Sequence, residues 1–206
     1  MSLERAKGTR KMSIYHVVVP LFDESHWTEL LIFDAVASVI DQDEPNQMST
    51  SQKIFTLAMV RKTNALLLGL KKKGFGEGKW NGFGGKVEKD ETISEGAVRE
   101  LEEESGLVAK CLTKIGILEF EFVGDPVLFE VHVFDVTQYE GEPVETEEMK
   151  PQWFPEDGIP YEKMWPDDIL WYPLYLKGIK FRGHFLYQGY DTILNYTLTQ
   201  MDHLPS

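Results

Sequence analysis

Residues 85–107 read GKVEKDETISEGAVRELEEESGL, and this stretch decides what kind of protein the chain can be. Apolar residues recur at helical spacing from Ile93 to Leu101, and Gly106 follows them as a stop signal. The pattern predicts a helix over residues 92–105. Glycines crowd the segment just before this stretch, which predicts a loop with close backbone approaches.

Three glutamates, Glu100, Glu103 and Glu104, lie on one face of this predicted helix because they are spaced i, i+3 and i+4. Like charges so close repel one another unless cations sit among them. An oxygen-only ligand set suits a hard cation, above all Mg²⁺, which binds few carboxylates together with substrate phosphates. The alternative is a solvated acidic face, the usual meaning of a glutamate run. Arg99, which can pair with Glu103, and the glycine-rich lead-in favour the metal site.

The rest of the chain predicts a mixed sheet with few helices, which places the protein in the α/β or α+β class. Predicted strands cover residues 54–61, 65–70, 111–123, 127–136, 180–188 and 193–199, and a second helix covers residues 167–175. No internal repeat and no low-complexity segment interrupts this order.

The 206-residue chain has a formal net charge of −13. A protein this acidic is a poor candidate for binding nucleic acid or an anionic membrane surface. Cys111 is the only cysteine, which excludes an intramolecular disulfide and indicates a reducing compartment. No apolar run approaches the roughly 18 residues of a membrane span, and no secretory signal is convincing. We expect a cytoplasmic protein, with the mitochondrial matrix or the nucleus as alternatives.

Residues 1–48 differ from the remainder and are predicted to be an N-terminal extension, followed by the functional domain over residues 49–206. Residues 1–11 are basic, as in a mitochondrial presequence, but acidic residues soon follow and favour an optional extension. Residues 27–40 have the spacing of a short amphipathic helix. Met48 follows a polar linker and is a candidate alternative start site.

The opening stretch also matches the Nudix box, G-x5-E-x7-R-E-U-x-E-E-x-G-U with U an aliphatic residue, at every fixed position. The matching residues are Gly85, Glu91, Arg99, Glu100, Leu101, Glu103, Glu104, Gly106 and Leu107. On these residues the chain resembles the Nudix hydrolase family. A Walker A phosphate loop is absent, because neither Gly-Lys pair in this region is followed by Ser or Thr.

The resemblance implies an enzyme that hydrolyses a nucleoside diphosphate linked to another moiety, built as a Nudix α/β/α sandwich around a mixed β-sheet. It implies Mg²⁺ as the cofactor, with Mn²⁺ as a substitute. The implied catalytic residues are Glu100, Glu103, Glu104 and Arg99: the arginine orients a carboxylate, and Glu103 or Glu104 accepts a proton from water. The implied metal ligands are Gly84 (through its carbonyl), Glu100, Glu103, Glu104 and Glu148. Glu148 stays open, because its acidic loop could equally be a solvated surface.

Residues 55–202 resemble one branch of the family, whose members hydrolyse oxidised purine nucleoside triphosphates. The segments that carry this resemblance are residues 73–76 (KGFG), 80–86 (WNGFGGK), 120–124 (FEFVG), 164–168 (MWPDD) and 191–194 (DTIL). Phe129 and Leu70 stand where methionines are expected, a departure that changes the expected shape of the pocket and not its chemistry.

The branch pattern contains the flat apolar walls and the few polar groups that a purine site needs. The expected substrate contacts are Thr56, Lys71, Phe75, Asn81, Phe83, Gly84, Gly85, Lys86, Phe120, Phe122, Trp165, Pro166, Asp167, Asp168 and Trp171. The aromatic members could equally be core residues. Asp167 and Asp168 could cap a helix. In a dry pocket, burial and like charge would instead raise the pKa of at least one of them, and a neutral carboxyl can donate a hydrogen bond.

These expectations define a Mg²⁺-dependent hydrolase of oxidised or methylated purine (deoxy)nucleoside triphosphates, such as 8-oxo-dGTP, 2-oxo-dATP or O6-methyl-dGTP. It would release the monophosphate and pyrophosphate and so keep mutagenic nucleotides out of DNA. We expect a monomer whose partner is a small nucleotide, with no nucleic acid and no membrane. The alternatives are a Nudix pyrophosphatase acting on dinucleoside polyphosphates or capped RNA, and a catalytically idle nucleotide sensor.

Overall fold

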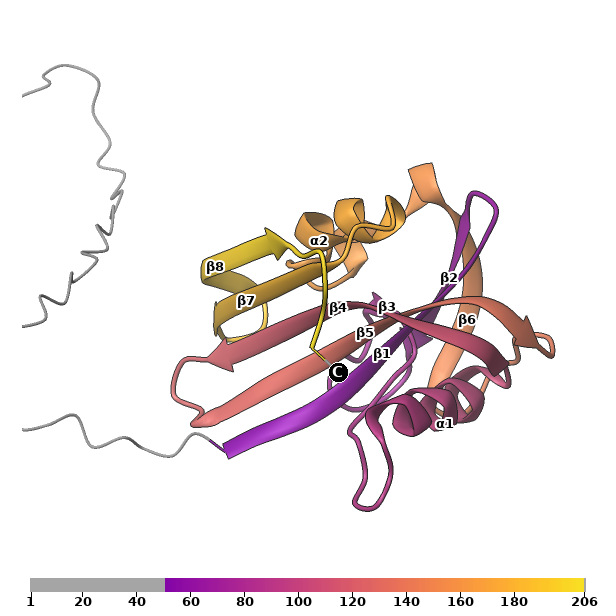
Figure 1. Cartoon of the computed structure of the whole chain (residues 1–206), viewed down its shortest axis with the longest axis horizontal. Coiled ribbons are helices and arrows are strands. Elements are labelled where there is room, and N and C mark those ends of the chain that lie inside the picture. Colours follow the sequence, from indigo (N-terminus) through magenta and orange to yellow (C-terminus); the bar gives the residue numbers. More distant parts are fainter. Residues whose placement is uncertain (1–50, 206) are drawn as a thin grey trace, which may run out of the picture. The chain divides into compact units, whose positions relative to one another are not determined.

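The computed structural model describes residues 51–205, which form an eight-stranded mixed sheet with two α-helices (Figure 1). The strands are β1 (Ser51–Lys62), β2 (Ala65–Lys71), β3 (Trp80–Asn81), β4 (Val108–Phe122), β5 (Val127–Glu140), β6 (Met149–Pro155), β7 (Phe181–Gln188) and β8 (Thr192–Gln200). The predicted helix at residues 27–40 and the candidate start Met48 lie outside the described residues.

Neighbouring strands run in the order β3-β2-β1-β5-β4-β7-β8, and β6 pairs with β2 off this path. Two of the pairings are parallel, β1 with β5 and β4 with β7, and the remaining pairings are antiparallel. The sheet is therefore mixed, as the sequence predicts. No helix among residues 51–205 is long and apolar enough to cross a membrane.

Successive residues of β1 point to opposite faces of the sheet and start two separate cores. Leu57 and Met59 pack in the core of α2 (Asp168–Leu176), which contributes the fully buried Trp171. Ala58 packs in the core of α1 (Ile93–Ser105) on the other face, together with Leu101. The two helices therefore cover opposite faces, and the predicted α/β/α sandwich is confirmed (Figure 1).

Local chemistry fixes both ends of α1. The Thr92 hydroxyl accepts the Glu95 N–H, and the Glu95 carboxylate accepts the Thr92 N–H at 2.7 Å, which together form a capping box. Gly106 ends the helix in the left-handed conformation, with φ 73°, and its N–H donates to the Glu102 carbonyl. The predicted helix is confirmed, with Thr92 acting as the cap rather than the first helical residue.

The sequence patterns missed two strands and two short 3₁₀ helices. β6 carries two prolines, which lack the N–H that a strand ladder uses, and its register against β2 is set by long-range pairing that a local pattern does not contain. β3 is only two residues long inside the glycine-rich loop. The 3₁₀ helices cover Glu156–Gly158 and Tyr161–Lys163 and lead from β6 toward α2.

Candidate active site

Glu104 is the most deeply buried of the glutamates on α1, with a side chain only 3% exposed. Its Oε1 accepts from the Lys71 ammonium at 2.8 Å, and its Oε2 accepts from the Gly84 N–H at 2.9 Å. Burial raises the pKa of Glu104, and the Lys71 ammonium acts in the opposite direction. Gly84 can approach this closely because it has no side chain; a Cβ there would collide with the Thr56 carbonyl.

Glu100 lies one turn earlier on the same helix, and its carboxylate packs against Gly85 of the glycine-rich loop. A Cβ on Gly85 would collide with the Glu100 carboxylate, so loop and helix are packed in direct contact. Burial raises the pKa of Glu100, against the hydrogen bond from Arg99. Glu103 is more open, since 60% of its side chain is exposed.

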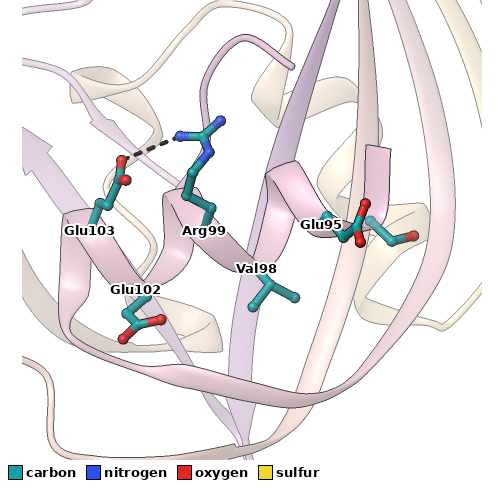
Figure 2. A pocket seen from close by; sticks show the side chains of 6 residues that line it. Glu95, Val98, Arg99, Glu102 and Glu103 are labelled. Atoms are coloured by element: carbon teal, nitrogen blue, oxygen red, sulfur yellow. Dashed lines mark hydrogen bonds and ion pairs between the residues drawn. The ribbon is translucent and has the colours of Figure 1, made fainter. Parts of the chain in front are cut away.

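Arg99 organises the outer side of the acidic helix. Its guanidinium binds the Glu91 carboxylate through two nitrogens, at 2.8 and 3.0 Å. It also reaches Glu100 at 2.9 Å and Glu103 at 3.3 Å, and the latter contact is drawn in Figure 2. The hydrogen bonds from Arg99 hold the pKa of Glu91 at about 2. The sequence predicted only the pairing with Glu103. Glu91 lies eight residues before Arg99 in a loop, and the sequence pattern does not predict the conformation of that loop.

A shallow groove of about 660 Å³ runs along this outer side of α1 (Figure 2). It is lined by Ser94, Glu95, Val98, Arg99, Glu102 and Glu103. Because α1 turns Glu104 toward Lys71 and Gly84 instead, the groove shares only Arg99 and Glu103 with the predicted catalytic set.

Glu148 comes close to α1 through strand pairing. The register of β6 against β2 puts Met149 opposite Lys71, so the residue just before the strand lies beside the lysine. The Lys71 ammonium contacts Glu148 Oε2 at 3.1 Å while it also binds Glu104. The structure therefore gathers Glu104 and Glu148 around one ammonium group.

The donor chemistry fits a hard cation. Glu100, Glu103, Glu104 and Glu148 offer only carboxylate oxygens, and a buried carboxylate such as Glu104 needs a positive partner. Among residues 51–205 no three acidic or other ligating side chains are already drawn together as a chelate. Arg99 and Lys71 hold these carboxylates instead, from outside the helix and from the sheet side respectively.

A cavity of about 1080 Å³ lies on the α2 side of the sheet and reaches the glycine loop. The predicted residues that line it are Thr56, Lys71, Phe75, Asn81, Gly84, Gly85, Phe120, Phe122, Glu148, Trp165, Asp167, Asp168 and Trp171. One cavity therefore joins an aromatic end, the basic side chain of Lys71 and two residues of the predicted metal site, Gly84 and Glu148.

Three predicted substrate contacts do not line this cavity. Phe83 is fully buried in the α1 core, because its bridge to Ala58 turns the ring to the opposite face of the sheet. Lys86 is exposed and contributes its carbonyl oxygen to Arg99 at 3.3 Å. Pro166 is absent from the cavity wall although its neighbours on both sides line it.

Asp167 and Asp168 are both buried at the aromatic end, at 3% and 2% exposure. Asp167 accepts from Trp171 Nε1 at 3.0 Å and from the Tyr187 hydroxyl at 2.6 Å. Asp168 accepts from the Trp165 N–H at 2.9 Å. Asp167 occupies the N-cap position of α2 but its side chain makes no capping bond, so the helix-cap alternative is wrong for it.

The two carboxyls have raised pKa values for the same first reason. Burial raises the pKa of Asp167, although the Tyr187 and Trp171 donors favour its ionised form. Burial raises the pKa of Asp168 further, and the adjacent Asp167 charge adds to the rise. Both carboxyls are therefore shifted toward the protonated form, and the upward shift of the pKa is larger at Asp168.

Aromatic rings close the mouth of the cavity. Phe75 stacks on Trp165 with ring centroids 4.9 Å apart, and Tyr190 meets Phe75 edge-on at 5.3 Å. Lys79 ties this mouth together, since its ammonium binds Asp191 at 3.1 Å and lies 5.0 Å from the Trp165 ring centroid. Tyr190 was missed from the sequence; the available signal is an aromatic residue in the turn between the last two strands.

Further cavity residues were missed because their positions depend on strand faces. Phe55 and Phe129 line the wall as a stacked pair with centroids 5.5 Å apart, so the Phe129 departure adds an aromatic surface. Thr56, which was predicted, has its Oγ1 buried without a hydrogen-bond partner among the described residues, so this hydroxyl is available to a ligand. Met149 and Tyr187 complete the wall near the two predicted ends of the site.

Comparison with known proteins agrees with this geometry. The NUDIX domain model matches residues 50–175, and the chain belongs to the Nudix family. The chain is 54% identical over 155 residues to the mouse oxidized purine nucleoside triphosphate hydrolase, a match covering 75% of this chain and 99% of that protein. The zebrafish protein of the same name is 52% identical, with the same coverage. A mutator MutT protein from Bacillus halodurans has a similar structure, with a TM-score of 0.64, 27% identity, and coverage of 71% of this chain and 97% of that one.

Proposed function

We propose that this Nudix hydrolase cleaves oxidised or methylated purine (deoxy)nucleoside triphosphates to the monophosphate and pyrophosphate. The observation that carries the proposal is the single cavity that runs from two buried carboxyls to Lys71, Gly84 and Glu148. Such a cavity suits a ligand with a flat polar base at one end and a polyphosphate at the other. The names of the mouse and zebrafish relatives support the same substrate class.

The base would be recognised by the carboxyl pair and the aromatic walls. A protonated Asp168 donates a hydrogen bond, whereas an ionised Asp167 only accepts one, so the pair offers both functions to the altered edge of an oxidised purine. Asn81 also lines the cavity and carries both donors and an acceptor. Phe75 and Trp165 provide stacking surface at the mouth.

The polyphosphate would meet the acidic helix. We propose Glu100, Glu103, Glu104, Glu148 and the Gly84 carbonyl as the groups that hold Mg²⁺, with Mn²⁺ as a substitute. When bound, the metal neutralises phosphate charge and activates water. Water would attack one phosphorus of the anhydride between the α- and β-phosphates, the bond from that phosphorus to the bridging oxygen would break, and the monophosphate and pyrophosphate would be released. Glu103 or Glu104 accepts the water proton while Arg99 holds the neighbouring carboxylates in place.

The substrate class is tested by comparing turnover of 8-oxo-dGTP, 2-oxo-dATP and dGTP with Mg²⁺, followed by product analysis. We expect the modified purines to be preferred and the products to be monophosphate and pyrophosphate. Turnover of dGTP at least as fast as every modified purine would exclude the sanitising role. Cleavage of dinucleoside polyphosphates instead, or no cleavage at all, would favour the two alternatives.

The proposed role of the helix is tested by Glu104→Gln. We expect turnover to fall by orders of magnitude, because the substitution removes a proposed ligand charge from the site. Glu102→Gln is the matched control, since Glu102 lies on the outer groove of the same helix. Equal activity of the two variants would remove Glu104 from the mechanism.

We also propose residues 49–206 as the catalytic domain and a monomer as the active form. The cavity supports the domain assignment, because all its lining residues fall within residues 55–190. The net charge of −13 supports small nucleotides rather than nucleic acid or membrane as partners. A compartment with reducing conditions, such as cytoplasm, mitochondrial matrix or nucleus, fits the single cysteine.

A further inference from the structure

One ammonium group links two carboxylates that belong to different elements. Lys71 ends β2, and its Nζ lies 2.8 Å from Glu104 on α1 and 3.1 Å from Glu148 before β6. Its side chain is only 19% exposed, and that of Glu104 is 3% exposed. A buried carboxylate is stable only with a compensating charge, so Lys71 acts as the counter-ion of this pair.

Lys73 also approaches this pair, at 3.5 Å from Glu148 Oε1, but Lys71 is the only cation among residues 51–205 that forms an ion pair with Glu104. Arg99 is committed on the far side of the helix to Glu91, Glu100 and Glu103, and it does not touch Glu104 in the described structure. Burial by itself would lower the pKa of Lys71, but the hydrogen bonds and charges of Glu104 and Glu148 outweigh it and the pKa is raised. Lys71 is therefore held in place as a fully charged group.

We propose that Lys71 is an exchangeable internal cation that holds the Glu104 and Glu148 oxygens until a divalent metal displaces it. The inference deepens the proposed function and rests on these two glutamates being metal ligands. Glu104 Oε2 already accepts from the Gly84 N–H, and the ammonium occupies Glu104 Oε1 and Glu148 Oε2, so a metal held by these two carboxylates would compete with Lys71 for their oxygens. The displaced ammonium stays at the cavity wall, where a phosphate oxygen can accept its hydrogen bonds.

This exchange has a consequence for the order of binding. Metal alone must displace Lys71 into water with no new partner, so the nucleotide-free protein binds metal weakly. Metal that arrives with a polyphosphate gives the ammonium a new anionic partner, so metal and nucleotide strengthen each other's binding. Between turnovers, the Lys71 ammonium would again compensate the charge of Glu104 and Glu148, so that α1 stays folded without metal.

The test measures Mn²⁺ binding to the nucleotide-free protein by electron paramagnetic resonance of free Mn²⁺, at pH 8 so that the carboxyls are ionised. We expect Lys71→Gln to bind Mn²⁺ on the order of tenfold more tightly than the natural chain, because the competing cation is gone. Lys72→Gln is the matched control. It removes the same charge from the neighbouring position, but the Lys72 ammonium pairs with Glu145 at 2.9 Å and not with Glu104 or Glu148. We expect the control to change the affinity by less than about twofold.

Unchanged or weaker Mn²⁺ binding by Lys71→Gln would overturn the proposal. An equal gain in affinity in both variants would also overturn it, because it would indicate an effect of net charge alone.

Amine acetylation of the natural chain, read residue by residue by mass spectrometry, tests the exchange without any substitution. We expect Mg²⁺ to increase labelling of Lys71 and to leave Lys72 unchanged. Unaltered Lys71 labelling at saturating Mg²⁺ would also overturn it. Neither measurement involves nucleotide, so the outcome is independent of the substrate comparison.

Discussion

Replacing Asp168 with Asn is expected to stabilise the protein, and increasingly so as the pH rises. Asp168 is 2% exposed and lies next to Asp167, so the ionised form is unfavourable in the folded state. An asparagine keeps the shape and retains an oxygen that can accept the Trp165 N–H, now bonded to Asp168 at 2.9 Å. The substitution therefore removes the cost of charging this site without removing its backbone contact.

The sign follows from proton linkage. The folded pKa of Asp168 lies above the unfolded value of about 3.9, so the native state binds more protons once the pH exceeds that value. The natural chain loses stability as the pH rises from about 4 to the folded pKa, whereas Asp168→Asn has no such loss. Each unit of pKa elevation corresponds to about 1.4 kcal/mol. At this size, 1 kcal/mol moves Tm by about 2–4 °C.

The assay is thermal unfolding of the natural chain and of Asp168→Asn, without metal, at intervals between pH 4 and pH 8. We expect Tm to be nearly equal near pH 4 and several degrees higher for the variant at pH 8. Asp157→Asn, on an exposed 3₁₀ helix, serves as the control and should follow the natural chain throughout. A difference that is constant with pH, or a less stable variant at pH 8, would refute the reasoning about this buried pair.

Three further substitutions test other parts of the site. Arg99→Lys should lower kcat by about 10- to 100-fold with little change in KM, because a lysine cannot bind Glu91 through two nitrogens while also reaching the helix glutamates; steady-state kinetics decide this. Gly84→Ala should reduce the free energy of unfolding by about 1–3 kcal/mol, since its Cβ collides with the Thr56 carbonyl, and urea denaturation at unchanged midpoint would contradict it. Tyr190→Ala should raise KM by about 2- to 10-fold at unchanged kcat, because the ring contacts the aromatic residue Phe75 of the cavity wall and is not one of the proposed metal-binding groups; a change in kcat alone would contradict that role.

The helix α1 could be predicted because all its signals are local. Helical spacing, a capping pair and a terminal glycine lie within one stretch, and so do Glu100 and Glu104. The first two strands, β1 and β2, could be predicted for the same reason, since their apolar runs are continuous and buried. What these patterns share is that sequence neighbours are also spatial neighbours.

The parts of the site that failed or stayed open depend on contacts between distant segments. Phe83 is an aromatic residue of the kind that lines a pocket, but its bridge to Ala58 places the ring in the core beneath α1. The alternation of side chains along a strand could not predict this, because Phe83 lies in a glycine-rich loop. Glu148 has no local signal at all. The register of β6 against β2 decides that it lies beside Lys71 rather than in solvent.

The electrostatics of α1 explain why the chain can be acidic and still suit a polyphosphate. The helix carries carboxylates on two sides, and each side has its own basic residue: Arg99 outside and Lys71 facing the cavity. Arg99 makes five contacts with carboxylates and a backbone carbonyl, so it is a fixed part of the fold. Lys71 holds only two carboxylate oxygens and lines the ligand cavity, so a cation and a phosphate arriving together can replace both of its contacts. Under the proposed function, the net charge of −13 would therefore disfavour long nucleic acids but leave the site open to a small nucleotide that brings its own metal.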